Sequence, residues 1–127
     1  MEGWVHLADL AAGEQRWTEA LSCTLEAARF APTSARLMSN RGFFLERLGR
    51  LDDALAAYEC ATRLAPHDGE ADLELALFLL MRGQGPDVVG PILAQAVRKT
   101  PELASDIEND PTLADLHELP LLRKALD

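Results

Sequence analysis

The residues best suited to chemistry, three histidines and two cysteines, are scattered without the spacing of a known kind of site. His6, His67 and His117 lack ligand-spaced partners, and Cys23 and Cys60 belong to no CxxC or Cys/His pair. The sequence also lacks a phosphate-binding glycine loop, a GxSxG motif and any carboxylate pair distinct from its general acidity. We therefore predict free thiols, no catalytic residue, no metal site, no cofactor and no enzymatic activity.

The net charge narrows the possible partners. In 127 residues, 12 Lys and Arg stand against 21 Asp and Glu, which gives a net charge of -9. This charge opposes binding to phosphate backbones and to anionic lipid, so we expect no nucleic-acid and no membrane partner. The apolar run 75–81 is far shorter than the roughly 20 residues of a membrane span, and the first residues lack a signal-peptide pattern. We therefore expect a cytoplasmic protein.

An internal repeat predicts the elements that must position any binding site. Pro32, Pro66 and Pro101 close three similar stretches and are 34 and 35 residues apart. A period of this length is typical of stacked helix-turn-helix units. Small residues recur within the units, where two helices can approach closely only if one side chain is small: Ala20, Ala27, Gly42, Ala54, Ala61, Ala76 and Ala96. Larger residues, Trp4 among them, are expected to fill the space around these contacts.

The turn inside each unit has its own pattern. We predict left-handed glycines at the end of the first helices, namely Gly13, Gly49 and Gly83. The expected caps of the second helices are Thr18, Asp52 and Asp87. The extra residue of the third unit then lies between Gly83 and Asp87, and Pro91 falls in the first turn of a helix that we expect to form.

The second unit resembles a tetratricopeptide repeat. The matching residues are Gly42, Leu45, Gly49, Ala54, Tyr58, Ala61 and Pro66. The resemblance extends over residues 1–101 and implies an all-α, right-handed solenoid of three antiparallel helix hairpins, at about 1–34, 35–68 and 69–101. Residues 102–127 are expected to form capping helices, because a repeat array needs a last element with one apolar and one wet face. The prediction is one domain over residues 1–127.

The resemblance also implies that the first helix of each unit lines a concave groove. We predict that a peptide or helix of a partner protein binds there, with apolar anchors and basic groups, through Asp9, Asn40, Phe43, Arg47, Glu70, Leu73, Glu74, Leu77 and Met81. Clamping a terminal carboxylate would need cations in the third unit, which instead has Glu70 and Glu74. The groove is therefore not expected to be a carboxylate clamp.

Several alternatives remain open from the residues alone. The apolar stripe of Leu73, Leu77, Leu80 and Met81 requires a cover, which is the chain's own tail, a partner segment or a second copy in a homodimer. Phe43 either binds a ligand or packs on the neighbouring unit. The alternative functions are a small chaperone or adaptor for a secreted or assembling partner, and a self-associating module.

Overall fold

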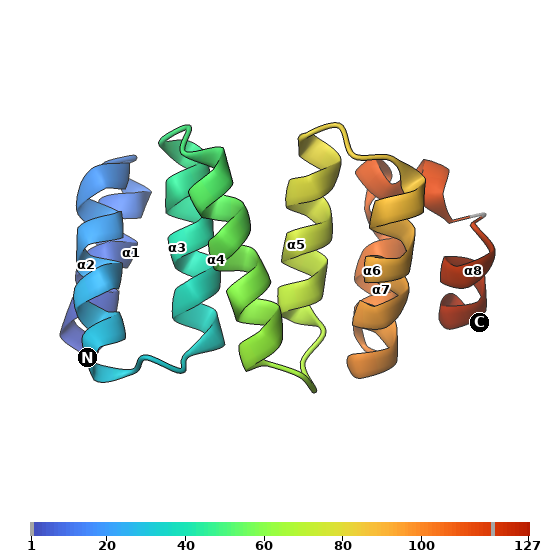
Figure 1. Ribbon diagram of the computed structural model, residues 1–127, viewed down its shortest axis with the longest axis horizontal. Coiled ribbons are helices and arrows are strands. Elements are labelled where there is room, and N and C mark those ends of the chain that lie inside the picture. Colours follow the sequence, from blue (N-terminus) through green and yellow to red (C-terminus); the bar gives the residue numbers. More distant parts are fainter. Residues whose placement is uncertain (1, 118) are drawn as a thin grey trace. The chain divides into compact units, whose positions relative to one another are not determined.

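The computed structural model describes residues 2–117 and 119–127, which form helices and no strand. The elements are α1 (Glu2–Gly13), α2 (Trp17–Phe30), α3 (Ala35–Arg47), α4 (Leu51–Leu64), α5 (Glu70–Met81), α6 (Pro86–Lys99), α7 (Leu103–Asn109), the 3-10 helix η1 (Pro111–Leu116) and α8 (Pro120–Leu126) (Figure 1). The all-α prediction is confirmed. Among the described helices, none combines the length and the apolar character that crossing a bilayer requires.

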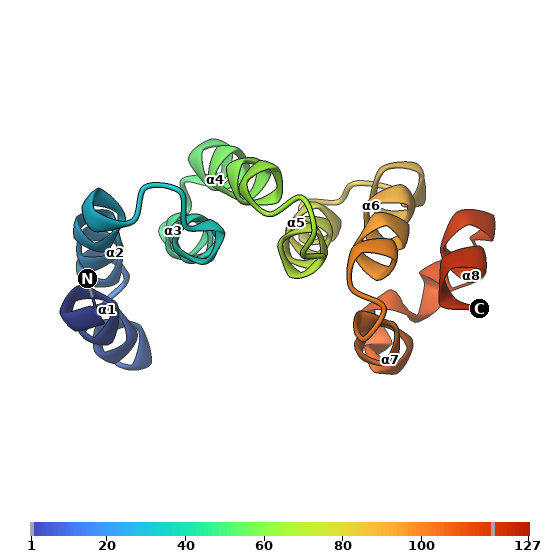
Figure 2. The same cartoon turned by 90° about the horizontal axis from the view of Figure 1, so that it is seen from below.

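The chain divides into two compact units, residues 1–64 and 65–127. In the first unit, α1 packs on α2, α2 on α3 and α3 on α4. In the second, α5 packs on α6, and α6 also contacts α7 and α8 (Figure 2). Each predicted repeat thus contains one helix pair, whereas the predicted single domain over residues 1–127 stays a prediction.

Small side chains lie at the contacts between the paired helices, as predicted. Six of these small residues have no exposed surface: Ala20, Ala27, Ala54, Ala61, Ala76 and Ala96. In the α3 and α4 pair, a Cβ on Gly42 would lie 3.0 Å from the Tyr58 ring, so glycine admits the ring. Trp4 on α1 is 37% exposed, and its role in filling the space around such a contact stays a prediction.

All three inter-helix turns begin with the same backbone motif. Gly49 and Gly83 have φ values of 78° and 84°. In the first repeat, Gln15 takes this left-handed conformation with φ 59°. Each of these residues donates its N–H to the carbonyl three residues before it, and the next residue donates to the carbonyl five before it, at 2.8–3.0 Å. This is a Schellman motif, which satisfies carbonyls at a helix end. The prediction of a left-handed Gly13 is therefore wrong, because Gln15 has the repeat-equivalent position.

The predicted helix caps are also wrong, because the second helices begin earlier than expected. Thr18, Asp52 and Asp87 all lie inside the first turn of their helices. In the first unit the last residue of the Schellman motif also opens the next helix: the Arg16 carbonyl accepts from Ala20, and the Arg50 carbonyl from Ala54, both at 3.0 Å. A separate capping residue therefore has no place in these turns.

The third turn contains the extra residue, as predicted. Four residues separate α5 from α6, whereas three separate the helices of the earlier pairs. Helix α6 begins at Pro86 and continues through Pro91, so the prediction that this helix forms is confirmed. A proline at the first helical position suits a helix start, because the N–H that it lacks has no helical partner there.

The core of the second unit is shared by the third helix pair and the tail. Its buried apolar residues come from α5 (Ala76), from α6, and from the tail, where Leu103, Ile107, Leu113, Leu116 and Leu122 are at most 5% exposed. Asp110 holds the turn between α7 and η1 by accepting hydrogen bonds from the Thr112 N–H at 2.9 Å and the Thr112 hydroxyl at 2.6 Å. These bonds, the one from the hydroxyl first, lower the pKa of Asp110.

A buried ion pair joins α5 to the end of α6. Lys99 Nζ lies 2.8 Å from Asp72 Oδ2, and the two side chains are 15% and 9% exposed. The contact lies outside good hydrogen-bond geometry at that oxygen, so it depends on charge rather than on a directed bond. Asp72 is an acid at a buried position of α5, and Lys99 is the compensating charge that sequence reasoning missed.

The left-handed residue in the first turn predicts that glycine is preferred there. Gln15→Gly should raise the free energy of unfolding by roughly 0.5–1 kcal/mol, because it removes the clash of a Cβ with the backbone. Gly49→Ala should lower it by about 1 kcal/mol. A Cβ at Gly49 would have no heavy atom within 4 Å, so that effect would come from the backbone conformation alone. Urea denaturation followed by circular dichroism measures both, and destabilisation by Gln15→Gly would contradict this account.

The close contact between α3 and α4 predicts a strong dependence on side-chain volume. Ala54→Leu should overpack a site of zero exposure and lower the stability by about 1–3 kcal/mol or more. Ala56→Leu is the matched control, because Ala56 is exposed on the same helix. Equal melting temperatures for the two variants would show that the contact adapts freely.

The buried ion pair predicts that removing one charge is worse than removing both. Lys99→Met should destabilise the protein by roughly 3 kcal/mol, because it leaves the Asp72 carboxylate buried without its cation. Adding Asp72→Leu should restore most of the loss in the double variant. Lys124→Met, at an exposed lysine of α8, controls for the loss of a positive charge. A double variant as unstable as Lys99→Met would show that the pair does not act as a unit.

Candidate functional site

The predicted site residues fall into both compact units, and each set is described by itself. Asp9, Asn40, Phe43 and Arg47 belong to the first unit, and the five residues from α5 belong to the second. On α3, Asn40, Phe43 and Arg47 follow one another at steps of three and four residues, so they form one stripe with Arg36. Asn40 and Phe43 are half-buried, whereas Arg36 and Arg47 are exposed.

Phe43 belongs to an aromatic cluster that connects α2 to α3. Its ring packs edge-on against Trp17, with 5.7 Å between centroids and an interplanar angle of 87°. Phe44 completes the cluster, with centroids 6.1 Å from Trp17 and 5.7 Å from Phe43. Phe43 of the second repeat thus packs on Trp17 of the first repeat, which is one of the two alternatives that the sequence left open. Trp17 is the partner that builds this surface, and sequence reasoning did not connect it with Phe43.

Arg47 covers the cluster. Its guanidinium carbon lies 5.1 Å from the centroid of Phe43 and 5.7 Å from that of Trp17, within the range of a cation–π interaction. Among the residues that the structure describes, Arg47 has no carboxylate partner. The planar guanidinium therefore keeps its outward N–H groups available while its face rests on the rings.

The charges of α3 differ from those of the rest of the chain. Its three arginines, at 36, 41 and 47, outnumber its one carboxylate, Glu46, which accepts a hydrogen bond from the Tyr58 hydroxyl at 3.1 Å. Within the described residues the side-chain amide of Asn40 has no hydrogen-bond partner. A half-buried amide and exposed guanidinium groups are the polar groups that α3 can offer to a ligand. Asp9 lies exposed on α1, outside the aromatic cluster.

In the second unit, the predicted residues of α5 have different environments. Glu70 and Glu74 are exposed, and Met81 is 73% exposed. Leu73, Leu77 and Leu80 are instead half-buried against the core that the tail completes. The core of the second compact unit therefore partly covers the apolar stripe of α5. Within the stripe, Met81 is the residue that this core does not cover.

The histidines and cysteines do not gather. Cys23 and Cys60 are free and half-buried, and no three His, Cys, Asp or Glu side chains in the described parts of the chain converge as metal ligands would. His117 has a structural contact, because its Nε2 lies 3.0 Å from the Ile107 carbonyl and joins η1 to α7.

Comparison with known proteins agrees with the repeat pattern. No family model matches the chain. Over 81 residues, 64% of its length, it is 35% identical to tetratricopeptide repeat protein 7B of Homo sapiens. It spans about 10% of the length of that relative.

Among solved structures, the fold is similar to that in the TPR2B-domain:pHsp70-complex of yeast Sti1. The TM-score is 0.72 at 21% sequence identity, over 98% of this chain and 94% of the other. At this level of identity the likeness to the solved structure shows the fold alone. The repeat in the sequence, the helix pairs and both comparisons support a helical-repeat fold of the tetratricopeptide type.

Proposed function

We propose that the chain binds a segment of a partner protein through the exposed face of α3, with α5 supplying a second, separate contact surface. The observation that carries the proposal is the side-chain amide of Asn40, which is half-buried and lacks a hydrogen-bond partner among the described residues. An amide offers both a donor and an acceptor, so it can pair with the backbone of an extended peptide.

The aromatic cluster supports the same proposal. The ring of Phe43 is held edge-on by Trp17, and the guanidinium of Arg47 lies over both rings. A surface preorganised in this way loses little side-chain entropy on binding, because the rings are already ordered. Packing of Phe43 on Trp17 therefore prepares the binding surface rather than excluding it.

The second unit favours a partner with apolar and basic groups. Residues 65–127 contain five basic residues and twelve acidic ones, a net charge of -7, whereas residues 1–64 have a net charge of -2. Exposed Glu70 and Glu74 lie on α5 one turn apart, and exposed Met81 offers an apolar contact on the same helix. Acidic tails are repelled by such a surface, so the proposal keeps the prediction that the chain is not a carboxylate clamp.

Peptides selected from a random display library against the full chain provide the test. For the selected peptides, Asn40→Ala should weaken binding about fivefold or more, which corresponds to the loss of roughly 1 kcal/mol from one hydrogen bond. Asn109→Ala, at an exposed asparagine of α7, is the matched control and should leave the affinity unchanged. Fluorescence polarisation measures the dissociation constants, and circular dichroism checks the fold of each variant.

A second pair of variants separates the two surfaces. Met81→Glu is the variant suited to the α5 surface, because it changes an exposed residue. Leu77→Glu is unsuitable as a test, because it would place a charge against the core of the second unit. Unchanged affinities for Asn40→Ala and Phe43→Leu would move the site away from α3. Micromolar binding of peptides that end in acidic residues would contradict the predicted partner class.

A further inference from the structure

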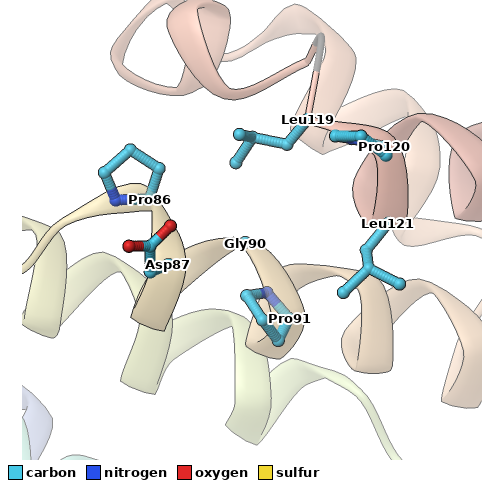
Figure 3. A pocket seen from close by; sticks show the side chains of 7 residues that line it. All are labelled: Pro86, Asp87, Gly90, Pro91, Leu119, Pro120 and Leu121. Atoms are coloured by element: carbon cyan, nitrogen blue, oxygen red, sulfur yellow. The ribbon is translucent and has the colours of Figure 1, made fainter.

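A pocket that none of the sequence motifs predicted lies in the second unit, between the start of α6 and the start of α8. Its volume is about 270 Å³, and it is lined by Pro86, Asp87, Gly90, Pro91, Leu119, Pro120 and Leu121. Figure 3 shows the α6 residues on one side of the space and the α8 residues facing them. Pockets that enclose a whole small ligand are generally about 300–1,000 Å³, so this one suits a single side chain better than a cofactor.

The pocket exists because the third helix pair departs from the repeat pattern. The fifth residue of the second helix is Leu21 in α2 and Leu55 in α4, but it is Gly90 in α6. Leu119 of the tail occupies the space of the missing side chain: its Cδ1 would be 2.8 Å from a Cβ on Gly90. The extra residue of the preceding turn places Pro86 at the mouth of the same space.

The chemistry of the lining is almost entirely apolar, with hydrogen-bond acceptors on one side only. Among the described residues that line the pocket, Asp87 is the one that carries a charge, and it has no ion-pair partner within the described chain. Pro91 has no N–H to donate to the Asp87 carbonyl four residues earlier, so this oxygen also lacks its helical donor. A carboxylate on the lining of an apolar cavity favours a ligand that brings a cation or another hydrogen-bond donor.

The residues around the pocket add to its apolar and to its acidic character. Leu121, which lines the pocket, is 54% exposed, so the pocket has an apolar side chain at its solvent edge. The net charge of -7 on residues 65–127 adds a general attraction for cations. A ligand that fits must therefore combine an apolar group for the cavity with a positive charge near its edge.

We propose that this pocket binds an apolar side chain of a partner protein, next to a lysine or arginine of the same segment that pairs with Asp87. The inference rests on the proposed function in that the ligand is a protein segment, and it assigns a site separate from α3 and α5. The rigid proline and leucine walls would hold the apolar side chain, while Asp87 would select its basic neighbour.

Nuclear magnetic resonance with short defined peptides tests the site on the full ¹⁵N-labelled chain. The probe is acetyl-Lys-Leu-Lys-amide, and the controls are acetyl-Lys-Ser-Lys-amide, which lacks the apolar group, and acetyl-Glu-Leu-Glu-amide, which reverses the charge. The first should shift the amide resonances of Asp87, Gly90 and Leu121 in a saturable way, and each control should bind several-fold more weakly. Equal shifts with all three peptides would overturn the proposal.

Matched variants locate the interaction. Asp87→Lys should weaken binding of the Lys-Leu-Lys peptide about fivefold or more, because an attraction becomes a repulsion. Asp106→Lys makes the same charge change in the first turn of α7 and should have little effect. Leu121→Ser should likewise weaken binding, whereas Leu25→Ser, at an exposed apolar residue of α2, should not.

The remaining outcomes separate this inference from the proposed function. Peptide-induced shifts confined to α3, abolished by Asn40→Ala, would overturn the pocket while supporting the α3 site. Shifts at Asp87 and Leu121 that appear with protein concentration alone would assign the pocket to a second copy of the chain and would also overturn the proposal.

Discussion

Close approach of two helices at alanine is the contact on which the rest of the structure depends. Ala20 and Ala27 in α2, Ala54 and Ala61 in α4, and Ala96 in α6 are fully buried. A methyl group at these positions lets two backbones approach until the larger neighbours interlock. The same alanine spacing recurs in α2 and α4, whereas α6 has the buried Val89 in place of the first alanine. The turns that hold the pairs are uniform, since each begins with a left-handed residue and two backbone hydrogen bonds.

The turns and helix contacts are similar in each helix pair, but the exposed faces of the helices differ between the two compact units. In the first, Trp17 at the start of α2 reaches Phe43 on α3, and the contact between two pairs becomes an ordered aromatic surface with Arg47 over it. In the second, the tail supplies much of the core. Under the proposed function, packing of Phe43 on Trp17 and binding by Phe43 are compatible roles, because the packing orders the ring that a ligand would contact.

The third helix pair shows how departures from a repeat create new chemistry. An acid at position 72 required a basic residue within reach, and Lys99 supplies it. A glycine in place of leucine at position 90 required a side chain from elsewhere, and Leu119 supplies it. Neither compensation is encoded near the residue that needs it. Both involve residues more than 25 positions away, which only the folded chain brings together.

The sequence by itself determined the helix pairs, the small residues at their contacts and the extra residue in the third turn, because these follow from local periodicity and side-chain size. It was misleading where local signals competed: Gly13 suggested a helix end that Gln15 actually forms, and Thr18, Asp52 and Asp87 suggested caps where the backbone of the turn already opens the helix. Tertiary structure alone decided that Trp17 meets Phe43, that Leu73 and Leu77 face a core, and that α6 and α8 enclose a pocket. Helical spacing predicts which residues share a face of one helix, but what that face meets depends on distant segments whose approach is governed by packing of the whole unit.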